Sequence, residues 1–355
     1  MIGIICFNSL RYAQFIYKYT KILDKENIEY EVIYWNREGD SIAQDKNWIS
    51  YEKRINTFQP FYKKIFSFIS FTCFMYKTIL NKKYDKLIIL TTQTAIPLFP
   101  LLMSKYRNKY IYDYRDITYE NIGIYKFMVN KLIDTSCFTA ISSRGFIDSK
   151  FLDSHNGKYV ISHNCRNLDL LNLKRKPSNK IRIVYWGQVR QVQFNKKICD
   201  LFGNDDRFQI IYHGAGFHDE LKKYIEIKKY KNINITGAYY LHEIESFAEN
   251  TDYILNMYEN DKQQKPAMTV KFYDALKYGL PMLVTKESYM SKIVDEYNLG
   301  LSIDLDERNV KDILINKKKD IYNGIGNNIK KMYDSVRKDD LFFEKELRRF
   351  TNFER

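Results

Sequence analysis

The sequence predicts an α/β protein built from two doubly wound, Rossmann-like domains that face a central cleft. Its 355 residues match the length of two ordinary domains. Strand-like and helix-like runs alternate along most of the chain, a pattern typical of parallel sheets covered on both faces. A polar, basic stretch at 166–180 interrupts this alternation. We therefore expect an N-terminal domain over 1–170, a C-terminal domain over 176–335, and a final helix over 336–355 that packs back across the domains to the N-terminal one.

The first half of the chain contains five strand-like runs separated by helical ones. Short apolar runs rich in β-branched and aromatic residues predict the strands, which we place at 2–7, 29–35, 86–92, 109–114 and 137–142. Apolar residues at helical spacing predict the helices, which we place at 12–25, 61–81, 98–105 and 125–134.

The second half repeats this scheme with six strand-like runs. The predicted strands lie at 181–187, 208–216, 233–239, 253–258, 281–285 and 300–305. The predicted helices begin near residues 195, 219, 241, 269 and 288, and helical periodicity continues over 311–355. Such a repeat of alternating elements indicates a second doubly wound domain.

Cysteine and histidine usage argues against metal sites and disulfides. The five cysteines are odd in number and form no CxxC pair, and none of the five histidines pairs with another at metal spacing. We expect reduced thiols in a cytoplasmic protein, with no metal and no cofactor. The six-residue apolar run after Met1 is too short for a signal peptide. No glycine-rich dinucleotide motif follows the first strand, so a redox role has little support.

Positive charge is concentrated in one part of the first half. The formal net charge is +14, and residues 51–109 contain eleven Lys and Arg against two acidic residues, an excess of nine. Residues 61–83 form an aromatic and aliphatic run with lysines at both ends, and its apolar core, Ile65 to Tyr76, is shorter than the roughly 20 residues that a bilayer span needs. We expect a helix lying on an anionic membrane surface. The alternatives are a core helix with a basic rim, or nucleic-acid binding, for which no recognised module accompanies the charge.

The stretch Lys265–Thr285 predicts a helix whose amino end opens into a loop. Thr269 is a suitable N-cap residue because its hydroxyl can accept from an amide of the first turn. The unpaired amides, the helix dipole and Lys271 together form a site for an anion. The alternative is that Lys271 and Asp274, at i and i+3, form an ordinary surface pair.

Three other loops follow strands of the second domain. Arg190 and Lys196 follow the first of these strands, Gly214 belongs to a Gly-x-Gly turn after the next, and Tyr239 follows the third. Because the carboxyl ends of parallel strands meet at one edge of a sheet, these loops and the helix at Thr269 are expected at the same edge. Two cations, two glycine turns and a helix amino end predict a diphosphate site with an aromatic neighbour.

The order and spacing of these motifs over Ile181–Asp306 resemble the GT-B glycosyltransferases, in particular the family 4-like enzymes that use nucleotide sugars. The pattern is strand-Gly-x-x-Arg with a Lys six residues on, strand-Gly-x-Gly, strand-Gly-x-x before a helix, then "ALKYGLPMLVT" and "IVDEYNLGLSI". In the first half, "YDYRD", "ISSRGF" and "SHN" resemble loops of the same family. The resemblance implies a GT-B fold, a nucleotide-sugar substrate and no requirement for a metal.

The resemblance also assigns roles to residues of the second domain. Arg190 and Lys196 would clamp the donor diphosphate and neutralise the charge that grows on the leaving group. Asp274 matches the second glutamate of the E-x7-E motif, which holds the ribose hydroxyls, but Pro266 stands eight residues earlier in place of the first. That departure leaves Lys271 with the helix amides as the stand-in for donor contacts. Further donor contacts are expected at Gly187, His213, Gly214, Tyr239, Thr269 and Val270.

The first domain is expected to bind the acceptor. Asp113, Arg115 and Asp116 follow a predicted strand, and Asn8 follows the first strand. If the reaction inverts the anomeric centre, a carboxylate such as Asp116 takes the proton of the acceptor hydroxyl. If it retains, as the resemblance to family 4 implies, the departing phosphate can accept that proton. The alternative for Asp113 and Arg115 is a structural ion pair at a strand end.

One motif competes with a metal-independent site. Asp304 and Asp306 form a DxD pair, which could hold a divalent ion against a diphosphate as in the other glycosyltransferase fold. The pair follows the last strand and precedes a polar helix, so we do not favour this interpretation.

The sequence thus predicts a hexosyltransferase that acts on a nucleotide sugar, UDP being the expected nucleotide. Its acceptor would be a saccharide on a membrane lipid, in capsule, exopolysaccharide or O-antigen synthesis, with retention and without a metal. We expect a cytoplasmic protein, peripheral at the inner face of the cell membrane. Two alternatives stay open: a non-catalytic GT-B partner subunit with a degenerate donor site, suggested by Pro266 and Asp274, and a basic nucleic-acid-binding protein.

Overall fold

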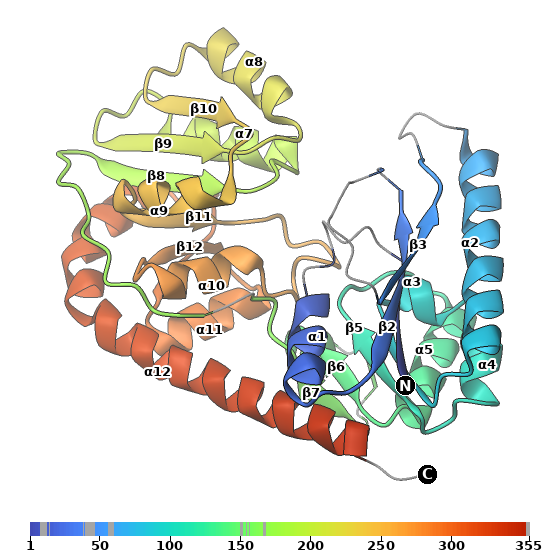
Figure 1. Ribbon diagram of the computed structural model, residues 1–355. Helices are drawn as coiled ribbons and strands as arrows, with labels where there is room; N and C mark the ends of the chain where they lie inside the picture. The colour runs from blue at the N-terminus through green and yellow to red at the C-terminus, as the bar shows by residue number, and fades with distance from the viewer. Residues whose placement is uncertain are drawn as a thin grey trace. The chain divides into compact units, whose positions relative to one another are not determined.

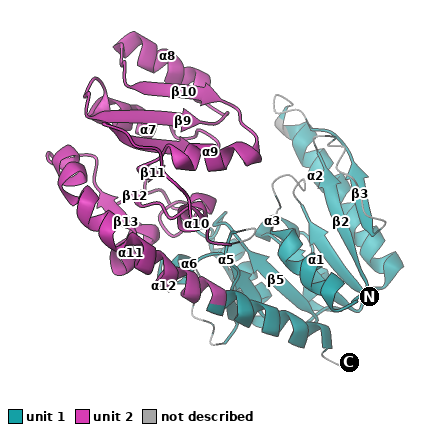
Figure 2. Ribbon diagram, turned by 60° about the vertical axis from the view of Figure 1, so that its left-hand side comes forward, with its two compact units in different colours: residues 1–166, 338–355 teal, residues 167–337 magenta. Residues whose placement is uncertain are grey.

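The chain divides into two compact units (Figure 2). Unit 1 comprises residues 1–166 and 338–355, and unit 2 comprises residues 167–337. The computed structural model describes residues 1–7, 13, 15–37, 39, 47–55, 60–149, 152, 153, 155, 157–165 and 168–352.

Unit 1 is built on a sheet of seven parallel strands (Figure 1). The strand order is β3-β2-β1-β4-β5-β6-β7, so the chain starts in the middle of the sheet and the order reverses between β1 and β4. Ile4 pairs with Val32 on one side and Ile88 on the other, and both faces are covered, which explains the continuous apolar runs. The bounds are β1 Ile2–Cys6, β2 Tyr30–Asn36, β3 Trp48–Glu52, β4 Lys86–Leu90, β5 Tyr110–Tyr114, β6 Thr139–Ile141 and β7 Tyr159–Ile161.

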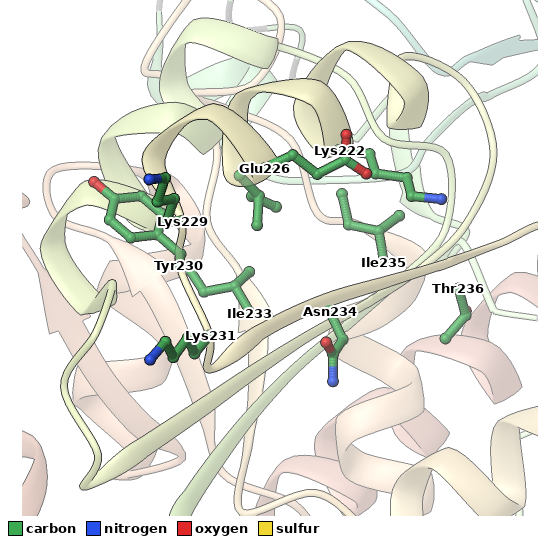
Figure 3. A pocket seen from close by; sticks show the side chains of 10 residues that line it. Lys222, Glu226, Lys229, Tyr230, Lys231, Ile233, Asn234, Ile235 and Thr236 are labelled. Carbon is green, nitrogen blue, oxygen red and sulfur yellow. The ribbon is translucent and has the colours of Figure 1, made fainter.

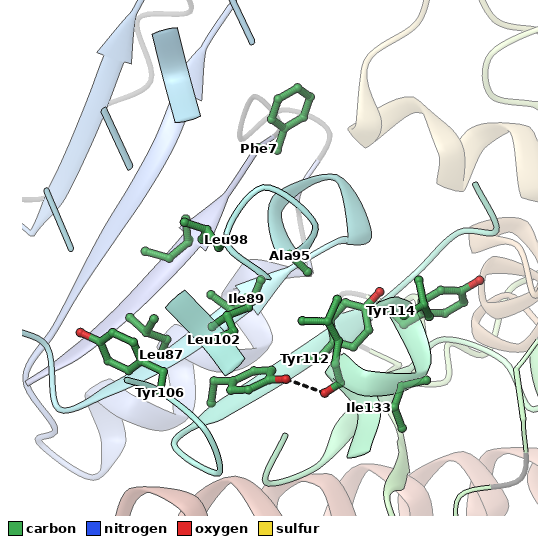
Figure 4. Packing of buried hydrophobic residues seen from close by; sticks show 14 of the residues in the cluster. Phe7, Leu87, Ile89, Ala95, Leu98, Leu102, Tyr106, Tyr112, Tyr114 and Ile133 are labelled. Atoms are coloured by element: carbon green, nitrogen blue, oxygen red, sulfur yellow. Dashed lines mark hydrogen bonds between the residues drawn. The ribbon is translucent and has the colours of Figure 1, made fainter. Parts of the chain in front are cut away.

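Helices cover both faces of this sheet. Helices α2, α4 and α5 supply Phe71, Leu102 and Leu132 to one buried cluster, in which Leu87 and Ile89 of β4 face Leu102 and Tyr106 (Figure 4). Helix α1 and the last turns of α12 supply Ile16, Tyr19, Phe343 and Leu347 to a cluster on the other face. The bounds are α1 Ile16–Lys25, α2 Phe61–Lys82, α3 Thr92–Ala95, α4 Phe99–Met103, α5 Gly123–Thr135, α6 Gly145–Asp148 and α12 Val310–Asn352.

Unit 2 is built on a second parallel sheet, of six strands in the order β10-β9-β8-β11-β12-β13. Its order reverses between β8 and β11, which lie side by side. The strands are β8 Ile181–Trp186, β9 Phe208–His213, β10 Ile233–Gly237, β11 Tyr253–Asn256, β12 Met282–Thr285 and β13 Gly300–Ile303. The helices are α7 Val192–Phe202, α8 His218–Lys228, α9 Ile244–Glu249, α10 Val270–Lys277 and α11 Tyr289–Tyr297, with a 3-10 turn η1 at Leu241–Glu243.

The predicted architecture of two parallel, doubly wound sheets is confirmed. Two strands were missed, β3 and β7, and each forms an edge of the unit 1 sheet. No residue of β3 is fully buried and β7 has only three residues, so neither carries the long apolar run that marks a central strand. The helix predicted over 98–105 is α4, Phe99–Met103, and the short helix α3, Thr92–Ala95, before it was missed. The helix predicted over 12–25 begins at Ile16.

Candidate functional site

The carboxyl edge of the unit 2 sheet brings together the ends of β8 and β11. In open α/β sheets, ligands bind outside the carboxyl ends of the strands at the point where the strand order reverses. Gly187 follows β8 directly, Tyr258 follows β11 by two residues, and α10 begins at Val270 after a loop. The residues around this point are therefore the first to consider as a ligand site.

Lys271, in the first turn of α10, is a buried cation without an acidic partner among the described residues. Its side chain is 6% exposed. The ammonium nitrogen donates to the Tyr258 hydroxyl and lies 4.1 Å from the ring centroid of Tyr185 and 4.9 Å from that of Tyr258. In the part of the chain that the structure describes, no carboxylate lies within ion-pair distance of it. Two aromatic faces stabilise a cation only partly, so a buried ammonium in this position favours a bound anion.

Both tyrosines around Lys271 stay neutral at physiological pH. Burial raises the pKa of Tyr185 to about 12, although the ammonium of Lys271 opposes the shift. Burial also raises the pKa of Tyr258. Neither ring therefore supplies a phenolate, and the positive charge of Lys271 is not neutralised by its neighbours. Tyr185 is fixed by a 2.5 Å hydrogen bond to the carbonyl oxygen of Gln188.

Glycines keep the approach to Lys271 open and hold two loops together. A side chain on Gly187 would begin 3.5 Å from the Lys271 ammonium, whereas glycine leaves that space free. A Cβ on Gly214 would lie 1.7 Å from the Gly187 carbonyl oxygen, so no other residue fits there. Two backbone hydrogen bonds join the chain after β8 to the chain at the end of β9. The amide of Gly187 donates to the carbonyl of His213 at 3.0 Å, and the amide of Val189 donates to the carbonyl of Ala215 at 2.7 Å. The predicted Gly-x-Gly turn thus serves close packing of the two loops.

The two predicted clamp residues have different partners. The guanidinium of Arg190 is exposed and donates twice to the side-chain oxygen of Gln188, at 2.6 and 3.0 Å. Lys196 forms an ion pair with Glu220 on α8 at 3.0 Å and lies 5.2 Å from the ring centroid of Tyr224. The structure therefore does not bring Lys196 to Lys271, because the nearest acid on the neighbouring helix holds its ammonium.

The amino end of α10 is capped as the sequence predicts. The Thr269 hydroxyl accepts from the amide of Phe272 at 3.3 Å and donates to the side-chain oxygen of buried Asn256 at 2.8 Å. Val270 beside it is exposed. Asp274 accepts a 2.9 Å hydrogen bond from the indole of Trp186. The alternative of a surface pair between Lys271 and Asp274 is wrong, because Lys271 turns inward to Tyr258.

His213 belongs to a small aromatic stack after β9 and β10. Its ring lies parallel to that of Phe247 at 3.6 Å, and Tyr239 meets Phe247 edge-on at 5.5 Å. Its Nδ1 lies 2.9 Å from the Thr236 hydroxyl. Burial lowers the pKa of His213 to about 4, although Glu243 opposes the shift. The ring is therefore neutral at pH 7 and contributes a flat surface and not a charge.

Asp113 and Arg115, at the end of β5, form a closed ion pair. Both are buried, and the guanidinium binds both carboxylate oxygens of Asp113. Arg115 also donates to the carbonyl and hydroxyl of Ser162 at 2.8 and 2.9 Å, and Tyr19 donates to Asp113 at 2.6 Å. Burial, with the charge of Asp113, raises the pKa of Tyr19. The geometry favours the structural ion pair over a direct contact with an acceptor.

Asp116 is the exposed carboxylate of this loop. Glu120, by contrast, is buried and accepts from the Tyr114 hydroxyl at 2.9 Å and from the amide of Thr118 at 2.5 Å. Asn8, the other predicted acceptor residue, lies outside the described residues. Asp116 is thus the residue of the predicted acceptor group whose side chain is open to solvent.

The DxD pair of Asp304 and Asp306, the possibility that was not favoured, lies in a turn. The Asp304 carboxylate accepts from the amide of Asp306 at 3.1 Å. Among the described residues, no group of three His, Cys, Asp or Glu side chains is arranged to hold a metal ion.

An open depression of about 600 Å³ lies between α8 and the edge strand β10 (Figure 3). Lys222, Glu226 and Lys229 line it from the side of α8, and Asn234 and Thr236 from β10. Lysines beside an edge strand protect it from pairing with other chains. None of the predicted donor residues lines this depression.

Helix α2 has a buried face and an exposed apolar face. Phe71, Met75 and Ile79 recur at four-residue spacing in the core. The opposite face exposes large apolar side chains, namely Tyr62, Ile65, Phe66, Ile69 and Leu80. In the part of the chain that is described, none of the helices has the length and hydropathy needed to span a bilayer.

Tyr185 and Tyr258, the two tyrosines beside Lys271, are site residues that were not predicted. The available signal was their position, because each lies at the end of one of the two strands that flank the reversal of strand order. A tyrosine near such a strand end is as typical of a core as of a site, so only the coordinates distinguish the two.

Solved structures with this architecture match the whole chain. Sucrose-phosphate synthase from Thermosynechococcus elongatus matches with a TM-score of 0.73 and 9% identity over 98% of each chain. Anabaena HepE in complex with UDP and glucose matches with a TM-score of 0.66 and 12% identity, again over 98% of each chain. WaaG, a glycosyltransferase involved in lipopolysaccharide biosynthesis, matches with a TM-score of 0.57 and 8% identity over 100% of this chain and 96% of its own.

These likenesses establish the fold. No protein-family model matches the chain, and no curated protein matches it in sequence. The two sheets, their strand order and the full-length matches to glycosyltransferase structures show that the chain has the GT-B fold.

Proposed function

We propose that the protein is a glycosyltransferase that moves a hexose from a UDP-sugar to a saccharide acceptor. The observation that carries this proposal is Lys271, a buried cation at the carboxyl edge of the unit 2 sheet to which no acid of the described part of the chain is paired. A diphosphate supplies the missing negative charge. The match to HepE, whose structure contains UDP and glucose, supports the choice of nucleotide.

In the proposed reaction the bond between the sugar's anomeric carbon and the diphosphate oxygen breaks, and a bond to the acceptor oxygen forms. Negative charge grows on the departing UDP, and Lys271, Arg190 and the first amides of α10 at Thr269 and Val270 stabilise it. With retention of configuration, the departing phosphate takes the acceptor's proton on the same face. These cationic groups take the place that a metal ion holds in other transferases.

The remaining donor contacts of the proposal lie on the loops after β8, β9 and β10. His213 and Tyr239, with their aromatic stack, provide a flat apolar surface for the nucleoside. Gly187 and Gly214 let backbone approach the phosphates. Lys196 is proposed as an outer contact only, because Glu220 already holds its ammonium.

Unit 1 is proposed to bind the acceptor. Asp116 is its exposed carboxylate after β5, with Asn8 on the loop after β1 as a second contact. The closed pair of Asp113 and Arg115 then shapes this loop and does not touch the acceptor. The exposed apolar face and lysines of residues 61–83 favour contact with an anionic membrane and hence an acceptor carried on a lipid.

This reading gives the protein a role in capsule, exopolysaccharide or O-antigen synthesis at the inner face of the cell membrane. The match to WaaG, a glycosyltransferase of lipopolysaccharide biosynthesis, is in keeping with that role.

Titration of UDP by calorimetry tests the donor site. Lys271→Met removes the charge and keeps an apolar chain of similar length, so we expect UDP affinity to fall on the order of ten- to a hundredfold, as for loss of a charge-assisted hydrogen bond. Lys277→Met is the control, because Lys277 lies on the same helix and its ammonium lies 5.1 Å from the ring centroid of Tyr278, the residue next to it in sequence. Equal affinity in Lys271→Met and Lys277→Met would refute the donor site.

The same titration separates the two predicted clamp residues. Arg190→Ala is expected to weaken UDP binding, because Arg190 lies near enough to Tyr258 to interact with it electrostatically. Lys196→Ala is expected to have the smaller effect, since it breaks a pair with Glu220.

A second candidate function is a non-catalytic partner subunit. It is favoured by Pro266, which stands where the family motif has an acid, and by Asp274, whose carboxylate accepts from Trp186. Release of UDP from UDP-sugars, followed with and without a lipid extract that supplies acceptors, distinguishes the two. A transferase forms UDP from the UDP-sugar, and does so faster when acceptor is present. A partner subunit binds UDP but forms none from the UDP-sugar.

A further inference from the structure

Unit 1 exposes a second group of large apolar side chains, away from α2. Four of them, Tyr119, Ile122, Ile124 and Phe127, lie within nine residues at the start of α5. On α2 the first nine residues hold a similar group, Tyr62, Ile65, Phe66 and Ile69. The eight side chains are between 43% and 68% exposed. Contiguous exposed apolar groups of this size mark interaction surfaces.

Topology places the two groups at the same edge of the unit 1 sheet. Helix α2 follows β3 and helix α5 follows β5, so the amino ends of both helices lie at the carboxyl edge of the parallel strands. Both helices contribute to the same buried cluster and therefore cover the same face of the sheet (Figure 1). The two groups therefore lie towards the same edge and on the same face of the sheet.

We propose that segment Tyr119–Phe127 is a second insertion point of unit 1 into an anionic lipid bilayer, alongside the amino-terminal half of α2. This inference rests on the membrane contact of α2 that belongs to the proposed function. The segment ends on α5, where the ammonium of Lys131 lies 5.8 Å from the ring centroid of Phe127. Lys126 and Lys131 pair with Asp153 and Asp134 at 2.9 and 3.8 Å, so the segment itself contributes apolar and aromatic side chains suited to the headgroup region and the basic excess comes from residues 51–109.

Charge favours a bilayer over a second copy of the chain as the occupant. Residues 51–109 alone carry an excess of nine positive charges. A symmetric dimer through this face would bring two such segments together, and like charges across an interface oppose association. An anionic leaflet attracts each basic residue near its surface by about 1 kcal/mol.

The second insertion point has a consequence for the reaction. Asp116 precedes Tyr119 by three residues, so its Cα lies within about 11 Å of the proposed insertion point along even a fully extended chain. An acceptor hydroxyl on a lipid-carried saccharide is presented just above the headgroups. Insertion of Tyr119–Phe127 therefore brings the exposed carboxylate of the acceptor loop to the height at which such a hydroxyl is found.

Binding to vesicles tests this inference. We expect the parent protein to sediment with phosphatidylglycerol-containing vesicles at low salt and not with pure phosphatidylcholine. Ile124→Ser with Phe127→Ser removes two inserted side chains, and vesicle affinity should fall by roughly tenfold or more, because each loses the transfer of apolar surface out of water. Leu341→Ser with Phe342→Ser is the matched control, because this exposed apolar pair lies on α12 within unit 1; it should bind as the parent does.

Three outcomes separate this inference from the proposals on which it rests. If Ile65→Ser with Phe66→Ser loses binding and the Ile124/Phe127 pair does not, the second insertion point is refuted while α2 stays a membrane helix. If the parent ignores anionic vesicles, both membrane proposals fail, while UDP titration still tests the donor site. If the Ile124/Phe127 pair changes only the oligomeric mass of the free protein, the surface joins copies of the chain and the inference is wrong.

A depth measurement makes the test independent of folding defects. Phe127→Trp places a fluorophore at the proposed insertion point. With vesicles of brominated anionic lipid, its emission should be quenched beyond that of the three natural tryptophans of the parent. Quenching equal to that of the parent overturns the proposal.

Discussion

Two buried cations, Lys271 in unit 2 and Arg115 in unit 1, lie in opposite electrostatic surroundings. Arg115 donates to Asp113 through Nε and Nη2 and to Ser162 through Nη1 and Nη2, so its charge and donors are satisfied within the chain. Lys271 has one hydroxyl partner and two ring faces, and no carboxylate of the described residues reaches it. Both follow strands at the carboxyl edge of a parallel sheet, so position alone does not separate them.

The presence or absence of a counter-charge distinguishes a buried charge that stabilises the fold from one that is suited to bind a ligand. A satisfied pair such as Arg115 and Asp113 stabilises the loop that contains it, and its removal damages the fold. An unsatisfied cation such as Lys271 costs folding free energy, and a bound anion offsets that cost. Substitution should therefore affect stability in unit 1 and ligand affinity in unit 2.

The largest expected effect is on the stability of unit 1. Asp113→Asn leaves the Arg115 guanidinium buried without its counter-charge, and breaking a buried pair in this way costs about 3–5 kcal/mol of unfolding free energy. Urea denaturation measures this loss. Asp85→Asn is the control, since Asp85 pairs with the N-terminus at 2.9 Å on the surface, and exposed pairs contribute about 1 kcal/mol or less. A loss below about 1 kcal/mol for Asp113→Asn would mean that the two cations do not differ as argued.

A smaller effect is expected at the hydroxyl that holds Lys271. Tyr258→Phe keeps the aromatic ring and removes the hydroxyl that accepts a hydrogen bond from the Lys271 ammonium. We expect unfolding free energy to fall by about 1 kcal/mol and UDP affinity by roughly three- to tenfold, because the ammonium loses a fixed position. Tyr253→Phe on β11 removes a hydroxyl that donates to the Leu314 carbonyl instead, so it should leave UDP affinity unchanged. Equal UDP affinity in both variants would contradict a positioning role for Tyr258.

The fold was predictable because its signals are local. Strands such as β4 and β8 are buried on both faces and therefore read as continuous apolar runs. The N-cap at Thr269 was predictable for the same reason, since capping depends on residues within one turn. Edge strand β3 escaped detection because its residues are only half-buried and its composition is mixed.

The site was predictable only in part, because it depends on which side chains face one another. Sequence spacing made Arg190 and Lys196 look alike, but Lys196 faces Glu220, an acid 24 residues away on another helix. In the sequence Lys271 looked like a surface lysine with an acid three residues later. In the structure it lies on the buried face of α10. Two tyrosines from different strands then enclose it. Contacts between residues that are far apart in the sequence cannot be predicted from the spacing of motifs along it.

His213 differs from both buried cations, because its buried ring is neutral at pH 7. Burial lowers its pKa in the folded protein to about 4, against about 6.5 in an unfolded chain. The unfolded state therefore binds the proton first, so stability is fully present above about pH 7 and is lost as pH falls from 6.5 towards 4.

The smallest expected effect is the loss of this pH dependence on substitution. His213→Phe preserves the parallel stack on Phe247, at 3.6 Å in the parent, and removes the titrating group. Urea unfolding at intervals between pH 7 and pH 4.5 should therefore show a flatter decline in unfolding free energy for His213→Phe than for the parent. Parallel profiles for His213→Phe and the parent would mean that His213 is protonated as readily in the folded protein as in the unfolded chain. His213 would then be a second buried positive charge, beside Lys271, at this edge of the sheet.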